Sequence, residues 1–147
     1  MNGPVVVDAS LAVKWLVDED YSDEARAIAR SWETRGVRTA APFLMPVEVT
    51  NALHRRVVEK ELSVEEAVGL LEFLLSSGLE LHAPPGLHHR ALELASLLQQ
   101  GAAYDSHYLA LAETLDCELW TADERFHRAA RQSARNVRWI GEPGILG

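Results

Sequence analysis

The sequence predicts an α/β protein in which a central parallel sheet is flanked by helices. The stretch Val5-Val6-Val7 is a continuous β-branched run without polar alternation, which is typical of a strand covered on both faces. Short strand-like segments alternate with helical segments along the chain, an order that favours right-handed crossovers and parallel strands. Asp8 follows the first run directly. Because ligands of open α/β sheets bind outside the carboxyl ends of the strands, this acid is placed to meet a ligand.

Length and composition set limits on the class of protein. A chain of 147 residues predicts one domain over 1–147, and its 24% charged and 48% hydrophobic residues are ordinary globular values. Apolar runs are too short to span a bilayer, and the N-terminus does not resemble a signal peptide, so we expect a cytoplasmic protein without a membrane partner. The single cysteine, Cys117, excludes an internal disulfide and a cysteine-built metal site.

The net charge of −8 counts against broad electrostatic binding of nucleic acid. Basic residues are nevertheless concentrated near the C-terminus, at Arg125, Arg128, Arg131, Arg135 and Arg138. Spacings of three and four residues would place several guanidinium groups on one helical face, suited to bidentate phosphate contact. A solvated helix face is an equally good interpretation of the same pattern.

The first half of the chain yields two strands and three helices. After the strand at 5–7, the apolar segment 11–17 predicts a short buried helix. Ser22 starts a second helix that Gly36 ends, and residues 37–41 are a candidate strand. Pro42 and Pro46 bracket the start of a third helix, which runs to about Lys60.

The middle of the chain has clearer boundary signals. Ser63 and Glu66 form a capping-box pattern, and the apolar helix that follows ends before Gly78. Residues 79–82 alternate like a strand. Residues 87–100 predict a helix that Gly101 closes as its C-cap.

The last third of the chain repeats the strand–helix order. Residues 104–115 predict a helix with Asp105 at its start, and residues 118–121 a strand that leads to Asp123. An arginine-bearing helix at 124–133 and a strand at 136–140 follow. Residues 141–147 remain unassigned.

Four acidic residues stand out by their placement in these elements. Asp8 and Asp123 follow strands, Asp105 begins a helix, and Glu48 lies within a helix between two valines. Each aspartate can be explained as a helix cap, but a cap does not explain Glu48. Its two β-branched neighbours indicate that Glu48 points into a partly enclosed site.

Converging carboxylates repel one another and favour a cation. In a cleft of low dielectric constant their pKa values rise unless a positive charge is present. Carboxylate oxygens without cysteine or paired histidine favour Mg²⁺ or Mn²⁺ over Zn²⁺. Such an ion is suited to phosphodiester hydrolysis, because it polarises the phosphate and activates water.

Four segments contain the four acids: Val5-Val6-Val7-Asp8-Ala9-Ser10, Pro46-Val47-Glu48-Val49-Thr50-Asn51-Ala52-Leu53, Tyr104-Asp105-Ser106-His107-Tyr108-Leu109-Ala110-Leu111-Ala112 and Trp120-Thr121-Ala122-Asp123-Glu124-Arg125-Phe126. Together they resemble the PIN-domain ribonucleases, most closely the VapC-type toxins of toxin–antitoxin pairs. Each motif alone is weak, but the ordered set covers the chain and is specific. The acidic net charge departs from what RNA binding favours.

The resemblance implies a PIN-like three-layer α/β/α fold and a Mg²⁺- or Mn²⁺-dependent endoribonuclease. It further implies an RNA substrate, a homodimer and inhibition by a cognate antitoxin protein. The quartet would be carried by Asp8, Glu48, Asp105 and Asp123, with Ser10 and Thr121 supporting the metal site.

Other residues near these motifs have two interpretations each. Asn51 lies one helical turn from Glu48 and is placed either to orient it or to be solvated. Arg55, Arg125 and Arg128 are candidates for RNA or antitoxin contact, with a solvated surface as the alternative.

Other function classes fit less well. A receiver domain would need a lysine near a late strand end, but the lysines are Lys14 and Lys60; a haloacid-dehalogenase-type phosphatase would need Asp or Thr where Ser10 stands. A PIN-fold binding or regulatory module without nuclease activity stays open. So does a housekeeping PIN nuclease that is not paired with an antitoxin.

Overall fold

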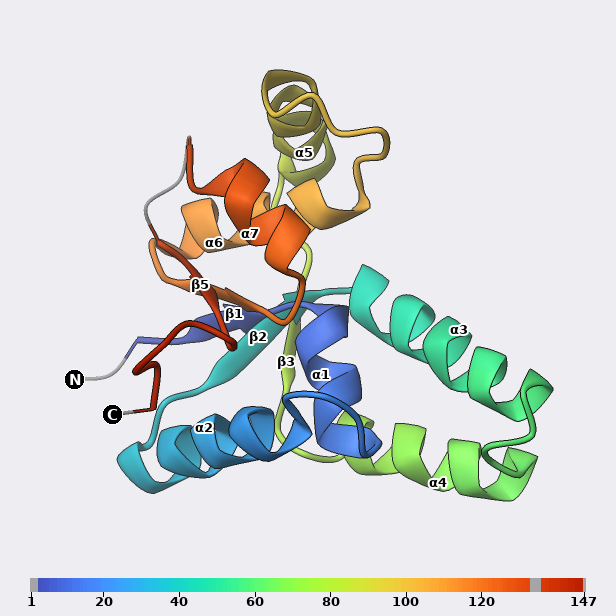
Figure 1. Ribbon diagram of the computed structural model, residues 1–147. Coiled ribbons are helices and arrows are strands. Elements are labelled where there is room, and N and C mark those ends of the chain that lie inside the picture. Colours follow the sequence, from blue (N-terminus) through green and yellow to red (C-terminus); the bar gives the residue numbers. More distant parts are fainter. Residues whose placement is uncertain (1–2, 133–135, 147) are drawn as a thin grey trace.

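Strands and helices alternate through the part of the chain that the computed structural model describes, residues 3–132 and 136–146 (Figure 1). The strands are β1 (Val5–Val7), β2 (Thr39–Pro42), β3 (Glu80–His82), β4 (Leu119–Thr121) and β5 (Val137–Trp139). The helices are α1 (Ala9–Leu16), α2 (Ser22–Arg35), α3 (Leu44–Val58), α4 (Val64–Leu75), α5 (Leu87–Leu97), α6 (Tyr104–Leu115) and α7 (Glu124–Ala130). The order of element types is the one expected from the sequence.

The five strands form one parallel sheet in the order β3-β2-β1-β4-β5. The chain builds the sheet outward from β1 to β3, then returns to place β4 and β5 on the other side of β1. This reversal puts a topological switch point between β1 and β4. A crevice therefore opens outside the carboxyl ends of these two strands, where Asp8 and Asp123 follow them.

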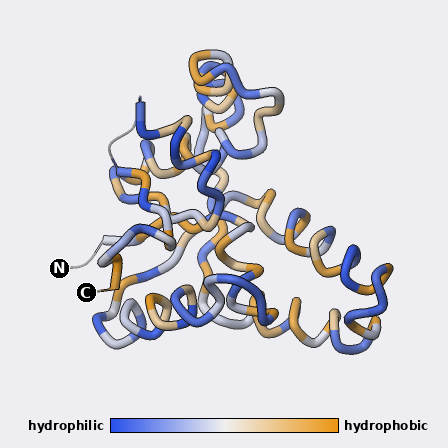
Figure 2. Tube along the Cα trace, viewed as in Figure 1, coloured by the Kyte–Doolittle hydropathy of each residue, from blue (hydrophilic) through white to orange (hydrophobic). Residues whose placement is uncertain are grey.

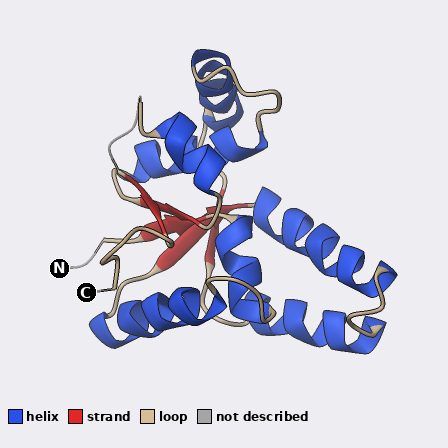
Figure 3. Cartoon of the chain, viewed as in Figure 1, coloured by secondary structure: helices blue, strands red, loops and turns tan. Residues whose placement is uncertain are grey.

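Helices cover both faces of the sheet and complete three layers, as predicted (Figures 1 and 3). Helices α6 and α7 lie on one face, and α1 and α2 on the other. Val5, Val6 and Val7 are all buried. This two-sided burial explains the unbroken apolar run, and each such side chain contributes about 1.5–3 kcal/mol when fully buried.

Helices α3 and α4 form a hairpin that projects from the sheet (Figure 1). Hydrophobic stretches run through this hairpin as well as through the central strands (Figure 2). Several of its apolar side chains are exposed: Val47, Val58, Val64, Val68 and Phe73. None of the described helices is both long and apolar enough to cross a membrane.

Some helix boundaries match the expected signals and others do not. The capping box is confirmed: Ser63 Oγ accepts from the Glu66 N–H, and the Glu66 carboxylate accepts from the Ser63 N–H. The prediction that Gly101 caps α5 is wrong. The helix ends at Leu97, and Gln99 takes the left-handed conformation with φ of 55°. The turn is closed by backbone bonds from Gln99 and Gln100, which make a glycine unnecessary.

The C-terminal arginines divide among several environments. Arg125 and Arg128 lie on α7, and Arg131 is its C-cap. Arg138 lies on β5, where it pairs with Glu118 and its guanidinium lies over the Trp120 ring. Arg135 lies outside the described residues. A shared helical face is therefore observed only for the arginines of α7.

Candidate functional site

Asp8 is both a helix cap and a buried member of the acidic site. Its Oδ1 accepts hydrogen bonds from the Leu11 N–H at 3.0 Å and from Ser10 Oγ at 2.7 Å, and Oδ2 accepts from Thr121 Oγ1 at 2.5 Å. The residue is only 3% exposed. Burial raises the pKa of the Asp8 carboxyl to about 7, although the bonds from Thr121 and Ser10 act in the opposite direction. Asp8 therefore caps α1, as one interpretation predicted, and also belongs to the acidic site.

Ser10 and Thr121 join the carboxyl ends of β1 and β4. Thr121 Oγ1 accepts from the Asp123 N–H at 3.0 Å while it donates to Asp8. Ser10 Oγ accepts from the Ala122 N–H at 3.0 Å and lies 3.2 Å from Thr121 Oγ1. These two hydroxyls thus fix the relative positions of Asp8 and Asp123.

Asp105 and Asp123 approach the same space from α6 and α7. Asp123 is the N-cap of α7, and its Oδ1 accepts from the Phe126 N–H at 3.1 Å. Asp105 lies in the first turn of α6 without capping it, so the cap interpretation fails there. Burial, together with the charges of Asp123 and Glu48, raises the pKa of Asp105 to about 6. The carboxylates therefore act on one another electrostatically.

Glu48 reaches the site from α3 and is held by a residue that sequence reasoning did not single out. Tyr108 Oη donates to Glu48 Oε1 at 2.5 Å. As expected, Glu48 lines a partly enclosed pocket, but only Val49 of its two neighbours is buried, whereas Val47 is 65% exposed. Successive helical residues face different directions, and only one neighbour can share the core. The available signal for Tyr108 was its i+3 spacing from Asp105.

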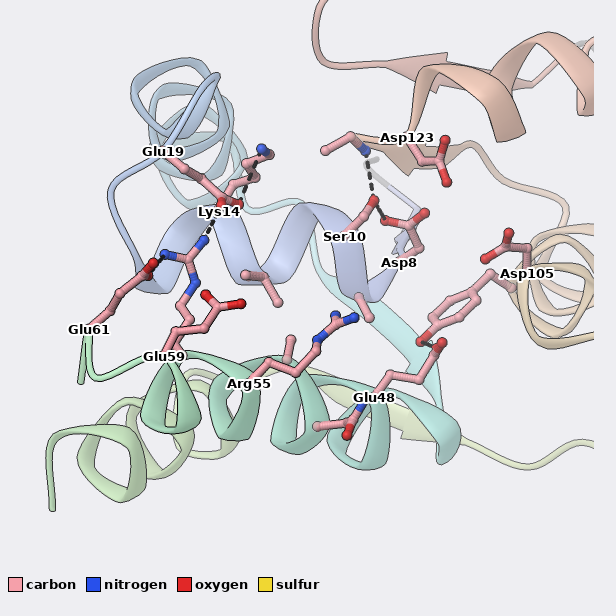
Figure 4. A pocket seen from close by; sticks show the side chains of 17 residues that line it. Asp8, Ser10, Lys14, Glu19, Glu48, Arg55, Glu59, Glu61, Asp105 and Asp123 are labelled. Atoms are coloured by element: carbon pink, nitrogen blue, oxygen red, sulfur yellow. Dashed lines mark hydrogen bonds and ion pairs between the residues drawn. The ribbon is translucent and has the colours of Figure 1, made fainter. Parts of the chain in front are cut away.

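A pocket of about 770 Å³ brings these side chains together (Figure 4). The four acids gather at one of its ends, with Ser10 and Asn51 also in the lining. The Arg55 side chain extends from α3 into the pocket (Figure 4). Thr121 is buried behind Asp8 and supports the site without lining the pocket.

The two ends of the pocket differ in charge balance. At the end away from the quartet, Glu19 pairs with Lys14 at 3.2 Å and with Arg56, and Glu61 pairs with Arg56 at 2.9 Å (Figure 4). Within residues 3–132 and 136–146, no ion pair reaches any of the four quartet acids. Among the described residues, the quartet end thus gathers four acids without a direct ion pair.

This charge and donor set fit a hard divalent cation. Among the described residues, no three acidic, histidine or cysteine side chains converge into a complete metal-binding group. Mg²⁺ commonly uses one or two carboxylates and keeps several water ligands, so a ready-made protein cage is not required. Burial first, and the neighbouring acids second, raise the pKa values of Asp8 and Asp105, and a bound cation would oppose both effects.

A second pocket of about 480 Å³ adjoins the first at the acids. Arg125 and Arg128 line it, and it shares Asp105 and Asp123 with the larger pocket. The predicted arginines therefore lie on two sides of the acidic centre, Arg55 on one and the α7 pair on the other.

Acids clustered at the β1–β4 switch point of a parallel sheet place this chain among α/β proteins with an acidic site outside the carboxyl ends of their strands. The sequence profile of the PIN domain matches residues 5–132. Ribonuclease VapC9 of Mycobacterium tuberculosis is 30% identical over 121 residues, which cover 82% of this chain and 87% of that protein. Ribonuclease VapC1 of the same organism is 34% identical over 127 residues, 84% and 89% of the two chains. The chain therefore belongs to the PIN-domain family and to its VapC group.

Solved structures agree in fold. PAE2754 from Pyrobaculum aerophilum superimposes with a TM-score of 0.69 at 21% identity, covering 93% of this chain and 83% of that chain. The sarcin-ricin loop cleaving toxin VapC20 of Mycobacterium tuberculosis gives a TM-score of 0.64 at 17% identity, covering 85% and 94%. These neighbours confirm the predicted three-layer architecture.

Proposed function

We propose that this protein is a VapC-like endoribonuclease that hydrolyses RNA phosphodiester bonds with Mg²⁺ or Mn²⁺ at Asp8, Glu48, Asp105 and Asp123. One observation carries the proposal: four carboxylates from separate elements line one end of a pocket, where no cationic side chain of the described residues pairs with them. The relatives VapC9 and VapC1 are named ribonucleases, which supports the assignment of RNA as substrate.

The chain's own residues hold the acids in place for this reaction. When bound, the divalent ion polarises the phosphate and lowers the pKa of an attacking water. Ser10 and Thr121 donate to both oxygens of Asp8 and so hold its carboxylate. Tyr108 holds Glu48 in the same way. Asn51 and Arg55 line the pocket beyond Glu48, where Arg55 is suited to contact a substrate phosphate.

The proposal includes a cognate antitoxin that inhibits the enzyme, a homodimer and a location in the cytoplasm. The resemblance to VapC-type toxins supports these partners. Exposed apolar side chains also support a protein partner, because such side chains on α4 and α5 include Val68, Phe73, Leu92 and Leu97.

A cleavage assay tests the proposed function. The purified protein, freed of any partner, is incubated with total RNA and Mn²⁺ or Mg²⁺, alongside a chelator control and the Asp8→Asn variant. We expect discrete cleavage that is absent from both controls. If folded, metal-binding protein cleaves no RNA, the nuclease assignment is wrong and a binding or regulatory module is favoured.

A further inference from the structure

We propose that the smaller pocket beside the acidic site binds one purine nucleotide of the RNA, directly next to the phosphate that is cleaved. Its polar walls are Gln99 and Gln100 from the α5–α6 connection and Arg125 and Arg128 from α7. The inference rests on the proposed nuclease function and adds a base preference to it.

The position of the pocket places its ligand beside the reacting phosphate. Asp105 and Asp123 line both pockets, so they form the wall between them. An RNA strand whose phosphate lies at the acids then extends a neighbouring nucleotide into the smaller pocket. Its volume of about 480 Å³ lies within the range of about 300–1,000 Å³ that is usual for ligand pockets.

The side chains in this pocket are those that recognise purine edges. Arginine pairs bidentately with O6 and N7 of guanine, and glutamine pairs bidentately with N6 and N7 of adenine. In single-stranded RNA these edges are accessible to side chains. Arg125 and Arg128 are both exposed, and among the described residues neither forms an ion pair. Their donors are therefore available to a ligand.

The backbone at Gln99 is a second, independent feature of the pocket. Gln99 has φ of 55°, the left-handed conformation that glycine adopts at least cost. Its N–H donates to the Ser96 carbonyl, and the Gln100 N–H donates to the Ala95 carbonyl, the arrangement in which a helix commonly ends on glycine. This turn places the Gln99 side chain in the wall of the smaller pocket, where a glycine would offer no hydrogen-bonding group.

Lys60 provides a matched control for Gln99. It has φ of 63°, and its N–H donates to the Val57 carbonyl while the Glu61 N–H donates to the Arg56 carbonyl. Lys60 lines neither pocket. Glycine at either position relieves the same backbone strain, but only the Gln99 variant loses a pocket side chain.

The test compares Gln99→Gly and Arg128→Ala with Lys60→Gly. Binding of labelled single-stranded RNA octamers, (AG)₄ and (UC)₄, is measured by fluorescence anisotropy in chelator, so that cleavage cannot interfere. We expect the unaltered protein to bind (AG)₄ about 10-fold more tightly. Gln99→Gly and Arg128→Ala should reduce this ratio to within about 3-fold, and Lys60→Gly should keep it. Both glycine variants should melt about 2–4 °C higher.

Mapping the ends of cleaved RNA gives a second readout. A purine should predominate at one of the two nucleotides that flank the cuts, and Gln99→Gly should weaken this bias. Cleavage without a purine bias, or equal binding of both octamers, overturns the pocket assignment while leaving the nuclease intact. A purine preference in binding without any cleavage supports the pocket and contradicts the nuclease. If Lys60→Gly alters the octamer ratio as much as Gln99→Gly, the pocket assignment is also wrong.

Discussion

Tyr108 Oη and Glu48 Oε1 lie 2.5 Å apart and join α6 to α3 at the acidic pocket. The phenol is almost fully buried, so its ring is also part of the core. Tyr108→Phe keeps the ring and removes the donor. We expect a loss of about 1 kcal/mol of stability and a decrease of about 10-fold in cleavage, because Glu48 is no longer oriented. Thermal melts and a Mn²⁺ titration of cleavage measure these effects. An unchanged Mn²⁺ dependence would show that the bond does not support the metal site.

Thr121 is predicted to stabilise the end of the sheet through its hydroxyl. Thr121→Val keeps the shape but leaves Asp8 Oδ2 and the Asp123 N–H without this partner. We expect the free energy of unfolding, measured in urea, to fall by about 1–3 kcal/mol. Thr121→Ser retains the hydroxyl and should lose less. A loss in Thr121→Val no larger than that in Thr121→Ser would contradict a dominant role for these hydrogen bonds.

The acidic centre should make the metal-free protein less stable as the pH rises. Burial raises the pKa of Asp8 to about 7, so the folded state binds this proton more tightly than the unfolded state. Stability in chelator should therefore be highest at acidic pH and should fall between about pH 4 and pH 7. Melting curves across this range measure the effect, and a rise in stability over the same window would contradict it.

Removing the charge of Asp105 should relieve the cost of its burial and its repulsion by Asp123 and Glu48. At pH 8 in chelator, Asp105→Asn should raise stability by about 1 kcal/mol, a modest value because the side chain is partly exposed. The gain should disappear at pH 4, where the carboxyl is protonated in the parent protein. Lower melting temperatures at pH 8 for both Asp105→Asn and Asp8→Asn would count against clustering of the acids.

A pair of glycines tests the packing of the C-terminal segment. A Cβ atom at Gly141 would lie 2.3 Å from the Trp139 ring, whereas one at Gly69, within α4, would meet nothing within 4 Å. Gly141→Ala should destabilise the fold by about 1–3 kcal/mol, and Gly69→Ala should stabilise it by about 0.5–1 kcal/mol. Chemical denaturation measures both, and a neutral Gly141→Ala would contradict the close packing.

The sequence predicted those features that depend on local signals. The apolar run of β1, the capping box at Ser63 and the acids that follow β1 and β4 are each encoded within a few residues. The tertiary contacts of the site are not encoded by such local signals. Tyr108 acquires its role from Glu48, which is 60 residues away along the chain. The sequence also predicted the wrong end for α5. The helix was expected to end at Gly101, but backbone bonds close it earlier, with Gln99 in the left-handed conformation.

Four of the pocket's acids are proposed to act as one metal-dependent unit, and conservative single variants separate them from the other acids of the pocket. Asp8→Asn, Glu48→Gln, Asp105→Asn and Asp123→Asn are compared with Glu59→Gln, which alters an acid in the same pocket outside the quartet. With Mn²⁺ and RNA, the quartet variants should each lose cleavage by about 100-fold or more, and Glu59→Gln should stay within about 2-fold of the parent. Retained cleavage in two or more quartet variants, or an equal loss in Glu59→Gln, would show that the four acids do not act as such a unit.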